Sequence, residues 1–242
     1  MSPFAAVLLR AGVGTPLDTV ATREILFQKN TVQVIRAMTL PDFWKGFQPN
    51  VLKFATRTPA QLVSIKVSSS VVPVNLDPAI RGVFIGVLSN GMEITVLNGW
   101  NALRTRFIQG QGWQVLRQEG ASLLTKGLSS AFAHRALSGA IFWSVYEKLR
   151  HEYPSHGAAV STISGVVQVI TTAPFYIAAI YKQGKDAPKE HLHQTIVRIF
   201  KAQGIRGLFL PALAPRLVHS AVTSAPLMWM MEELHLIQRK TK

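Results

Sequence analysis

Cations within apolar stretches are the residues whose types and spacing point to chemistry. Three polar residues stand 12 positions before recurring apolar or aromatic landmarks: Lys53, His134 and His219 precede Ile65, Tyr146 and Met231. The next position along the chain holds Phe54, Arg135 or Ser220. A basic ring at this level would suit a small carboxylate or phosphate anion. The alternative is that Lys and Arg extend along apolar surface to reach water, and that the histidines form local hydrogen bonds.

A second set of residues at a shared offset includes a carboxylate. Arg10, Glu93 and Gln168 each stand six residues before a helix-breaking position, at Pro16, Gly99 or Pro174. Charges inside apolar spans usually pair or line a cavity. We expect Arg10 and Glu93 to form an intramembrane pair, with binding of a cationic ligand by Glu93 as the alternative.

Enzymatic chemistry finds no support in the sequence. The seven histidines are scattered, and there is no H-E-x-x-H, no G-x-x-x-x-G-K-[ST] and no nucleophile elbow. The absence of cysteine excludes thiolate catalysis, cysteine-ligated zinc and iron–sulfur sites. We therefore expect no enzyme, no metal site and no cofactor.

The composition combines strong basicity with few charges. The 242 residues include 26 Lys and Arg against 12 Asp and Glu, a net charge of +14, yet only 16% are charged and 48% are hydrophobic. A basic chain raises nucleic-acid binding first, but ordinary globular domains are already about 25% charged. The basic residues also lack an aromatic-lined face of the kind that binds single strands. A membrane protein with basic loops, and no nucleic-acid partner, fits better.

Six apolar stretches are candidates for membrane spans, which need about 20 apolar residues. They cover 3–17, 54–65, 82–103, 136–146, 157–181 and 217–231, and 157–181 has 25 residues without one charge. Gly82 and Gly86 are spaced for close helix packing. The alternative is a set of buried helices in a soluble protein.

The net charge is divided unequally between the segments that join these spans. Segments 23–45, 104–126 and 182–206 together carry +9. Segments 66–81, 147–156 and 232–242 carry +2, and the spans themselves +3. The positive-inside tendency places the first set in the cytoplasm or the mitochondrial matrix, and both termini on the other side.

The chain contains a repeat of about 80 residues. A basic residue stands 10 positions before Gly or Pro at three sites 81 and 84 residues apart: Arg36 and Gly46, Arg117 and Gly127, Lys201 and Pro211. The copies cover approximately 1–75, 76–153 and 154–242 of one domain, 1–242. Each predicts a long helix, a kink, a basic loop with a short amphipathic helix, and a second long helix. Three parallel copies predict an all-α membrane protein with six transmembrane helices, pseudo-three-fold symmetry and a central cavity.

Several motifs lie at these landmarks: PLDTVATR at 16–23, WKGFQPNVLK at 44–53, EG at 119–120, KG at 126–127 and YEKLR at 146–150. At these residues the sequence resembles the mitochondrial carrier family over nearly its whole length. The resemblance implies an inner-membrane protein with matrix loops and both termini in the intermembrane space. It also implies substrate contacts at Lys53, His134, Arg135, His219 and Ser220.

The resemblance further implies a gate of ion pairs at each end of the cavity. The matrix gate would retain Pro16, Asp18 and Arg104, and the intermembrane-space gate Tyr146, Glu147 and Arg150. The other gate charges of the family are largely replaced, in all three copies. Because exposed ion pairs contribute only about 0–1 kcal/mol each, one remaining pair would bias a conformational equilibrium poorly.

Two helix starts on the basic side are candidate lipid sites. Trp44, Lys45 and Gly46 precede one helix, and Lys126 and Gly127 precede another. Helix N-termini attract anions, and the resemblance implies cardiolipin headgroups as the ligand. The alternative is a simple interfacial anchor.

Two functions remain open from the sequence. The first is a degenerate carrier-like inner-membrane protein that serves as an accessory subunit of a larger assembly, such as a respiratory complex, with transport weak or lost. The second is a functional solute carrier that exchanges a small anionic metabolite by alternating access. The lipid bilayer, cardiolipin and other inner-membrane subunits are the expected partners.

Overall fold

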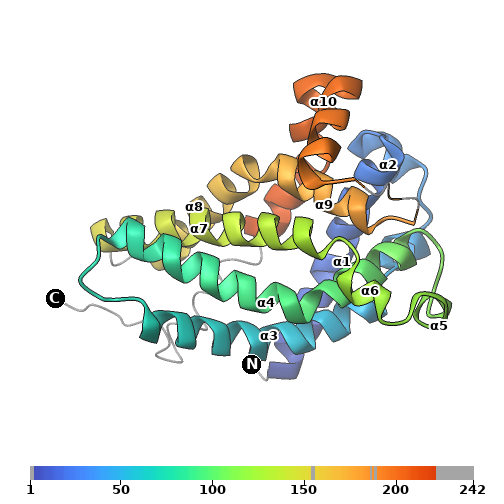
Figure 1. Ribbon diagram of the computed structural model, residues 1–242. Helices are drawn as coiled ribbons and strands as arrows, with labels where there is room; N and C mark the ends of the chain where they lie inside the picture. The colour runs from blue at the N-terminus through green and yellow to red at the C-terminus, as the bar shows by residue number, and fades with distance from the viewer. Residues whose placement is uncertain (1–2, 154–155, 186, 188–189, 222–242) are drawn as a thin grey trace.

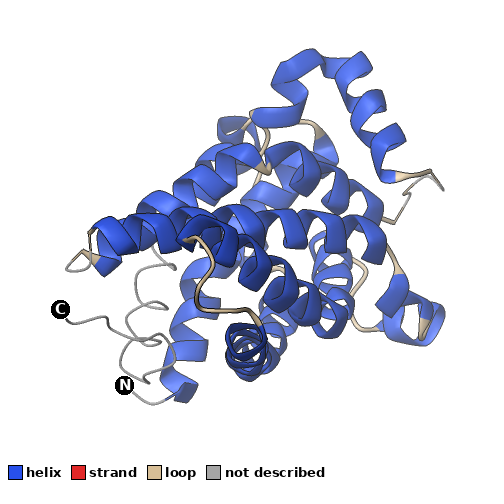
Figure 2. Cartoon of the chain, turned by 60° about the vertical axis from the view of Figure 1, so that its left-hand side comes forward, coloured by secondary structure: helices blue, strands red, loops and turns tan. Residues whose placement is uncertain are grey.

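The computed structural model describes residues 3–153, 156–185, 187 and 190–221 (Figure 1). Within these ranges the chain forms helices and loops and no strand, so the all-α prediction is confirmed (Figure 2).

Long helices form the body of the molecule and short helices lie in the connections. The long ones are α1 (Pro3–Phe27), α3 (Phe47–Val71), α4 (Pro78–Ile108), α7 (Leu128–Glu152), α8 (Gly157–Thr171), α9 (Ala173–Gln183) and α10 (Leu192–Phe209). The short ones are α2 (Thr31–Arg36), η1 (Leu40–Trp44), α5 (Gln114–Glu119) and α6 (Ser122–Thr125). A further helical segment covers 213–221.

The repeat landmarks correspond to helix starts. Gly46 and Gly127 precede α3 and α7 and have φ angles of 86° and 67°, a left-handed conformation that glycine adopts without steric cost. Pro211 stands in the turn between α10 and segment 213–221. The same sequence offset therefore marks the start of a helical segment in each copy.

The helix-breaking positions behave differently from one another. Pro16 lies inside α1 and Gly99 inside α4, and both helices continue through them. The third position coincides with a break at Thr172, where the axes of α8 and α9 are bent by 65°. Pro174 stands in the first turn of α9, where a missing N–H leaves no helical hydrogen bond unmade.

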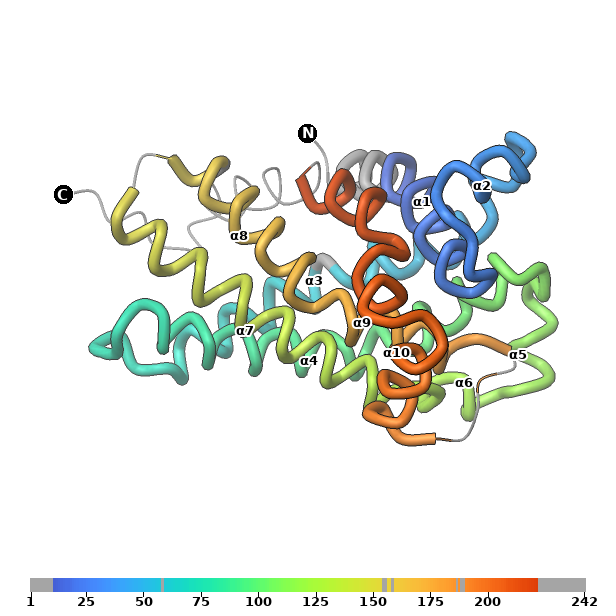
Figure 3. The backbone as a smooth tube through the Cα atoms, turned by 90° about the horizontal axis from the view of Figure 1, so that it is seen from above, coloured from blue at the N-terminus to red at the C-terminus, as the bar shows by residue number. Residues whose placement is uncertain are grey.

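The backbones of α4 and α7 touch, and the two helices lie side by side (Figures 1 and 3). A Cβ atom added to Gly86 would lie 2.1 Å from the carbonyl oxygen of Gly139. One added to Gly82 would lie 2.3 Å from the oxygen of Trp143. The Gly82–Gly86 spacing therefore does mark a close helix contact, with Gly139 as its counterpart.

Hydropathy supports fewer membrane spans than the six predicted. Among the described helices, α4 alone is long and apolar enough to cross a membrane, and the bent pair α8–α9 qualifies if it counts as one span. Lys53, Arg57 and Lys66 lower the hydropathy of α3, and stretch 217–231 lies mostly outside the described residues. The structure thus establishes the helical fold, while the six-span arrangement stays a prediction.

Candidate functional site

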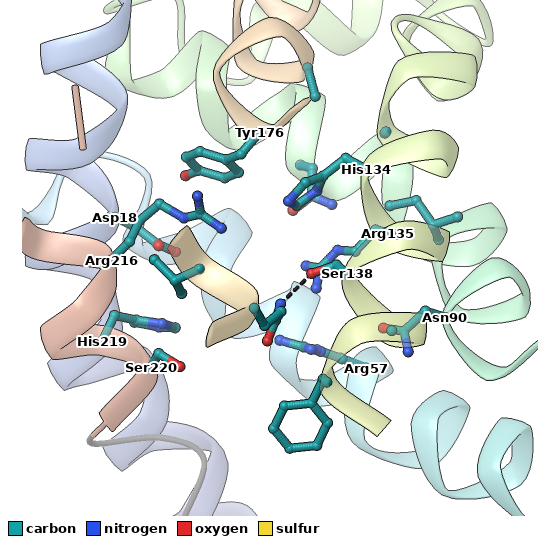
Figure 4. A pocket seen from close by; sticks show the side chains of 18 of the residues that line it. Asp18, Arg57, Asn90, His134, Arg135, Ser138, Tyr176, Arg216, His219 and Ser220 are labelled. Atoms are coloured by element: carbon teal, nitrogen blue, oxygen red, sulfur yellow. Dashed lines mark hydrogen bonds between the residues drawn. The ribbon is translucent and has the colours of Figure 1, made fainter. Parts of the chain in front are cut away.

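A cavity of about 200 Å³ lies among the long helices. Side chains from α1, α3, α4, α7, α8, α9 and segment 213–221 line it. Figure 4 shows Arg216 and His219 on one side of this space, His134 and Arg135 on the other, and Tyr176 above them. Helices from all three predicted repeats therefore contribute to one polar site.

One side of the cavity consists of ion pairs between α1, α3 and α4. Asp18 pairs with Arg104, and Lys53 Nζ lies 3.5 Å from Asp18 Oδ2. Arg57 Nε lies 2.7 Å from Glu93 Oε1, whose side chain is only 2% exposed. We call these five residues the paired wall.

Neutral polar groups support the paired wall. Asn50, fully buried beside Asp18, donates from Nδ2 to Thr15 Oγ1 at 2.9 Å and so joins α3 to α1. Gln183 Nε2 donates to Asn98 Oδ1 at 3.3 Å and joins α9 to α4. These hydrogen bonds fix the helices that carry the charges.

A second group of lining residues contains cations without carboxylates, and its members come from both sides of the cavity (Figure 4). It consists of His134, Arg135, Tyr176 and Arg216, which we call the open wall. The Arg216 guanidinium carbon lies 3.8 Å from the centre of the Tyr176 ring. The His134 ring lies 5.4 Å from the same ring, centre to centre. Among the described residues, neither Arg135 nor Arg216 has a carboxylate within ion-pair distance.

The residues predicted to contact substrate lie close together in the structure. They all line the cavity: Lys53, His134, Arg135, His219 and Ser220. Sequence reasoning missed Arg57, Tyr176 and Arg216 as neighbours of these residues. Arg57 is one helical turn beyond Lys53, a spacing that puts both on one helix face and that could have revealed it.

Glu93, the acid of the second predicted set of residues, has an ion-pair partner among the described residues. Glu93 pairs with Arg57 of α3, whereas the side chain of Arg10 lies outside the described part of the chain. Gln168, the third member of that set, donates a hydrogen bond to Ser138. Glu93 therefore pairs with a cation of the neighbouring helix, and its expected pairing with Arg10 stays a prediction.

The two predicted gate sets lie at opposite ends of the long helices and differ in chemistry. Asp18 and Arg104 form the expected ion pair, two residues after Pro16 on α1. At the other end Tyr146 is fully buried in an apolar cluster, and Glu147 Oε2 lies 3.2 Å from Arg81 Nη1. The partly exposed Arg150 stands one turn beyond Tyr146 on α7.

The lysines of the two candidate lipid sites have acid partners. Lys45 Nζ lies 2.6 Å from Asp42, and Lys126 Nζ lies 3.4 Å from Glu119. Hydrogen bonds from Lys45 and from Thr39 hold the pKa of the Asp42 carboxyl well below its usual range. Trp44 is 43% exposed beside Gly46, and Gly127 follows Lys126. A headgroup at either site would compete with these carboxylates.

No known family or curated protein matches this chain by sequence comparison. Within the described residues, no group of three His, Asp or Glu side chains could hold a metal ion. The chemistry available in the cavity is electrostatic and hydrogen-bonding: arginine, lysine and histidine side chains that face a small polar volume.

Proposed function

We propose that the chain is a carrier-type membrane protein that binds and exchanges a small anionic metabolite in its central cavity. The observation that carries the proposal is the charge of the lining. Five basic side chains line the cavity, which are Lys53, Arg57, Arg104, Arg135 and Arg216, and two carboxylates oppose them: Asp18 in the lining and Glu93 paired with Arg57. A concave site with uncompensated positive charge concentrates anions and binds them.

The exposed face of α4 supports a membrane location. Its large exposed side chains are apolar and recur every three or four residues: Ile80, Val83, Phe84, Val87, Leu88, Met92 and Val96. The opposite face packs on α3 and α7. A stripe of this kind on a 31-residue helix suits contact with lipid tails.

The repeat supports the carrier architecture within this proposal. Six spans in three parallel copies would place the basic segments in the matrix of the mitochondrion and both termini in the intermembrane space. The matching helix starts at Gly46 and Gly127 agree with two copies of one unit. Cardiolipin remains the proposed lipid at these starts.

An accessory role in a larger inner-membrane assembly is the second candidate. It is favoured by the third copy, where Tyr176 and Ala179 stand in place of a gate acid and a gate base. A cavity left open at the level of Lys53 and Arg135 favours binding of a solute over this role.

Exchange measurements in liposomes separate the two functions. The full-length protein is reconstituted, and counter-exchange of labelled phosphate and labelled succinate is followed. We expect saturable exchange that Arg135→Gln abolishes and that Arg117→Gln, an exposed change on α5, leaves intact. No exchange of either anion, together with migration only within a large complex on a native gel, would overturn the transport proposal in favour of the accessory one.

A further inference from the structure

The size of the cavity limits the ligand. Its volume of about 200 Å³ is below the roughly 300–1,000 Å³ of sites that enclose drug-sized ligands. An inorganic phosphate or a four-carbon dicarboxylate is small enough for this space.

The distribution of charge limits the ligand further. Lys53 and Arg104 share Asp18, and Arg57 is paired with Glu93. Among the described residues this leaves Arg135 and Arg216 as the cavity's cations with no carboxylate at ion-pair distance. The two arginines line the cavity from opposite sides (Figure 4). A ligand with two negative charges would neutralise both.

Tyr176 orients one of these arginines. The Arg216 guanidinium lies against the face of the Tyr176 ring at 3.8 Å, well within the range of a cation–π contact. Contact through its flat face leaves the N–H groups at the edge of the guanidinium directed away from the ring. Those edge groups bind carboxylate or phosphate oxygens in a bidentate manner.

His134 supplies a hydrogen-bonding group with no partner in the described structure. The residue is 7% exposed, lines the cavity, and its buried Nε2 atom makes no hydrogen bond to a described residue. Buried polar atoms in folded proteins nearly always have a partner. In the tautomer that carries hydrogen on Nε2, His134 can donate to an oxygen of a ligand held between the two arginines.

We infer that the ligand is a small dianion, a phosphate or a short dicarboxylate, held by Arg135 and Arg216 with a hydrogen bond from His134. The inference rests on the proposed function and adds the charge and size of the ligand and the residues that hold it. The paired wall contributes no direct contact to the two negative charges.

Ligands matched in size and different in charge test the inference. Calorimetry on the detergent-purified full chain at pH 8 compares succinate, its monoamide succinamate, inorganic phosphate and the nucleotide AMP. We expect succinate or phosphate to bind about 10-fold or more tighter than succinamate, because each charge-assisted hydrogen bond contributes that much. AMP, a larger dianion, should not compete. Equal affinity for succinate and succinamate, or tighter binding of AMP, would overturn the inference while leaving an anion site in place.

Variants test whether Arg135 and Arg216 bind the two negative charges of the ligand. Arg135→Gln or Arg216→Gln should lower affinity for the dianion about 10-fold to 100-fold and remove its advantage over succinamate. Arg135→Lys keeps the charge and should keep that advantage, and Arg117→Gln should change nothing. His134→Phe should weaken both ligands by a similar factor. A dianion preference that survives both Gln variants would refute the assignment, and no binding of any anion to the wild-type protein would refute the proposed function with it.

Discussion

The paired wall and the open wall both contain basic side chains and differ in the partners of those side chains. On the paired wall, Lys53, Arg57 and Arg104 lie within 4.0 Å of Asp18 or Glu93. On the open wall, Arg135 and Arg216 line the same cavity, and Arg216 lies against the Tyr176 ring instead of a carboxylate. The division follows the helices, since the pairs join α1, α3 and α4 while the other cations come from α7 and segment 213–221.

This difference separates two uses of a buried charge. A charge that leaves water must be compensated by a partner, and a pair across two helices compensates both charges and holds the helices together. A cation that has only a ring beside it remains available to an anion. The paired wall therefore accounts for structure, and the open wall, in our proposal, for binding.

Asp18→Asn should have the largest effect on stability, because it leaves both Lys53 and Arg104 without a carboxylate. Breaking a buried pair by removing one partner typically costs about 3–5 kcal/mol. Thermal unfolding in detergent measures the loss. In a working carrier the exchange rate should also change sharply. If stability and exchange are both unchanged, the paired wall has no structural function.

Glu93→Gln should cost about 3 kcal/mol for the same reason, since Arg57 alone loses its acid. The substitution also converts a paired cation into an unmatched one that faces the cavity. We therefore expect tighter binding of succinate to this variant than to the wild type, measured by calorimetry. Weaker anion binding in a folded Glu93→Gln protein would contradict the division of the cavity into two walls.

Gly86→Val tests the contact that holds the two walls together. Gly86 on α4 touches the backbone of Gly139 on α7, and the added side chain would have to push the helices apart. Overpacking of this kind costs about 1–3 kcal/mol, read as a lower unfolding temperature, and it should weaken anion binding as well. Gly12→Ala is the matched control, because a Cβ there meets nothing within 4 Å. Equal behaviour of the two variants would argue against the helix contact.

Much of the site could be predicted from one sequence because the repeat fixes the level of residues along each helix. The offsets from Ile65 and Tyr146 place Lys53 and His134 at corresponding depths, and both residues line one cavity in the structure. The helical fold and the α4–α7 contact also follow from local patterns, namely apolar stretches and the Gly82–Gly86 spacing.

The choice of partners could not be predicted in the same way. Offsets give depth along a helix but not rotation about its axis, so they could not decide which cation faces Glu93. They also gave no reason to place Arg216 against Tyr176, because a cation–π contact leaves no acid in the sequence to mark it. The break at Thr172 but not at Pro16 or Gly99 likewise depends on how each helix packs.

Arg135→Gln should have the smallest effect on stability and is the sharpest contrast with Asp18→Asn. Removing this charge leaves no carboxylate unpaired, and it relieves repulsion from Arg57. We expect the free energy of unfolding to change by less than about 1 kcal/mol, with stability unchanged or slightly higher in thermal unfolding without anion. Added succinate should then stabilise the wild type but not the variant, because a ligand stabilises only the state that binds it. A large loss of stability without ligand would instead mean that Arg135 has a structural partner, and the open wall would lose its distinction from the paired wall.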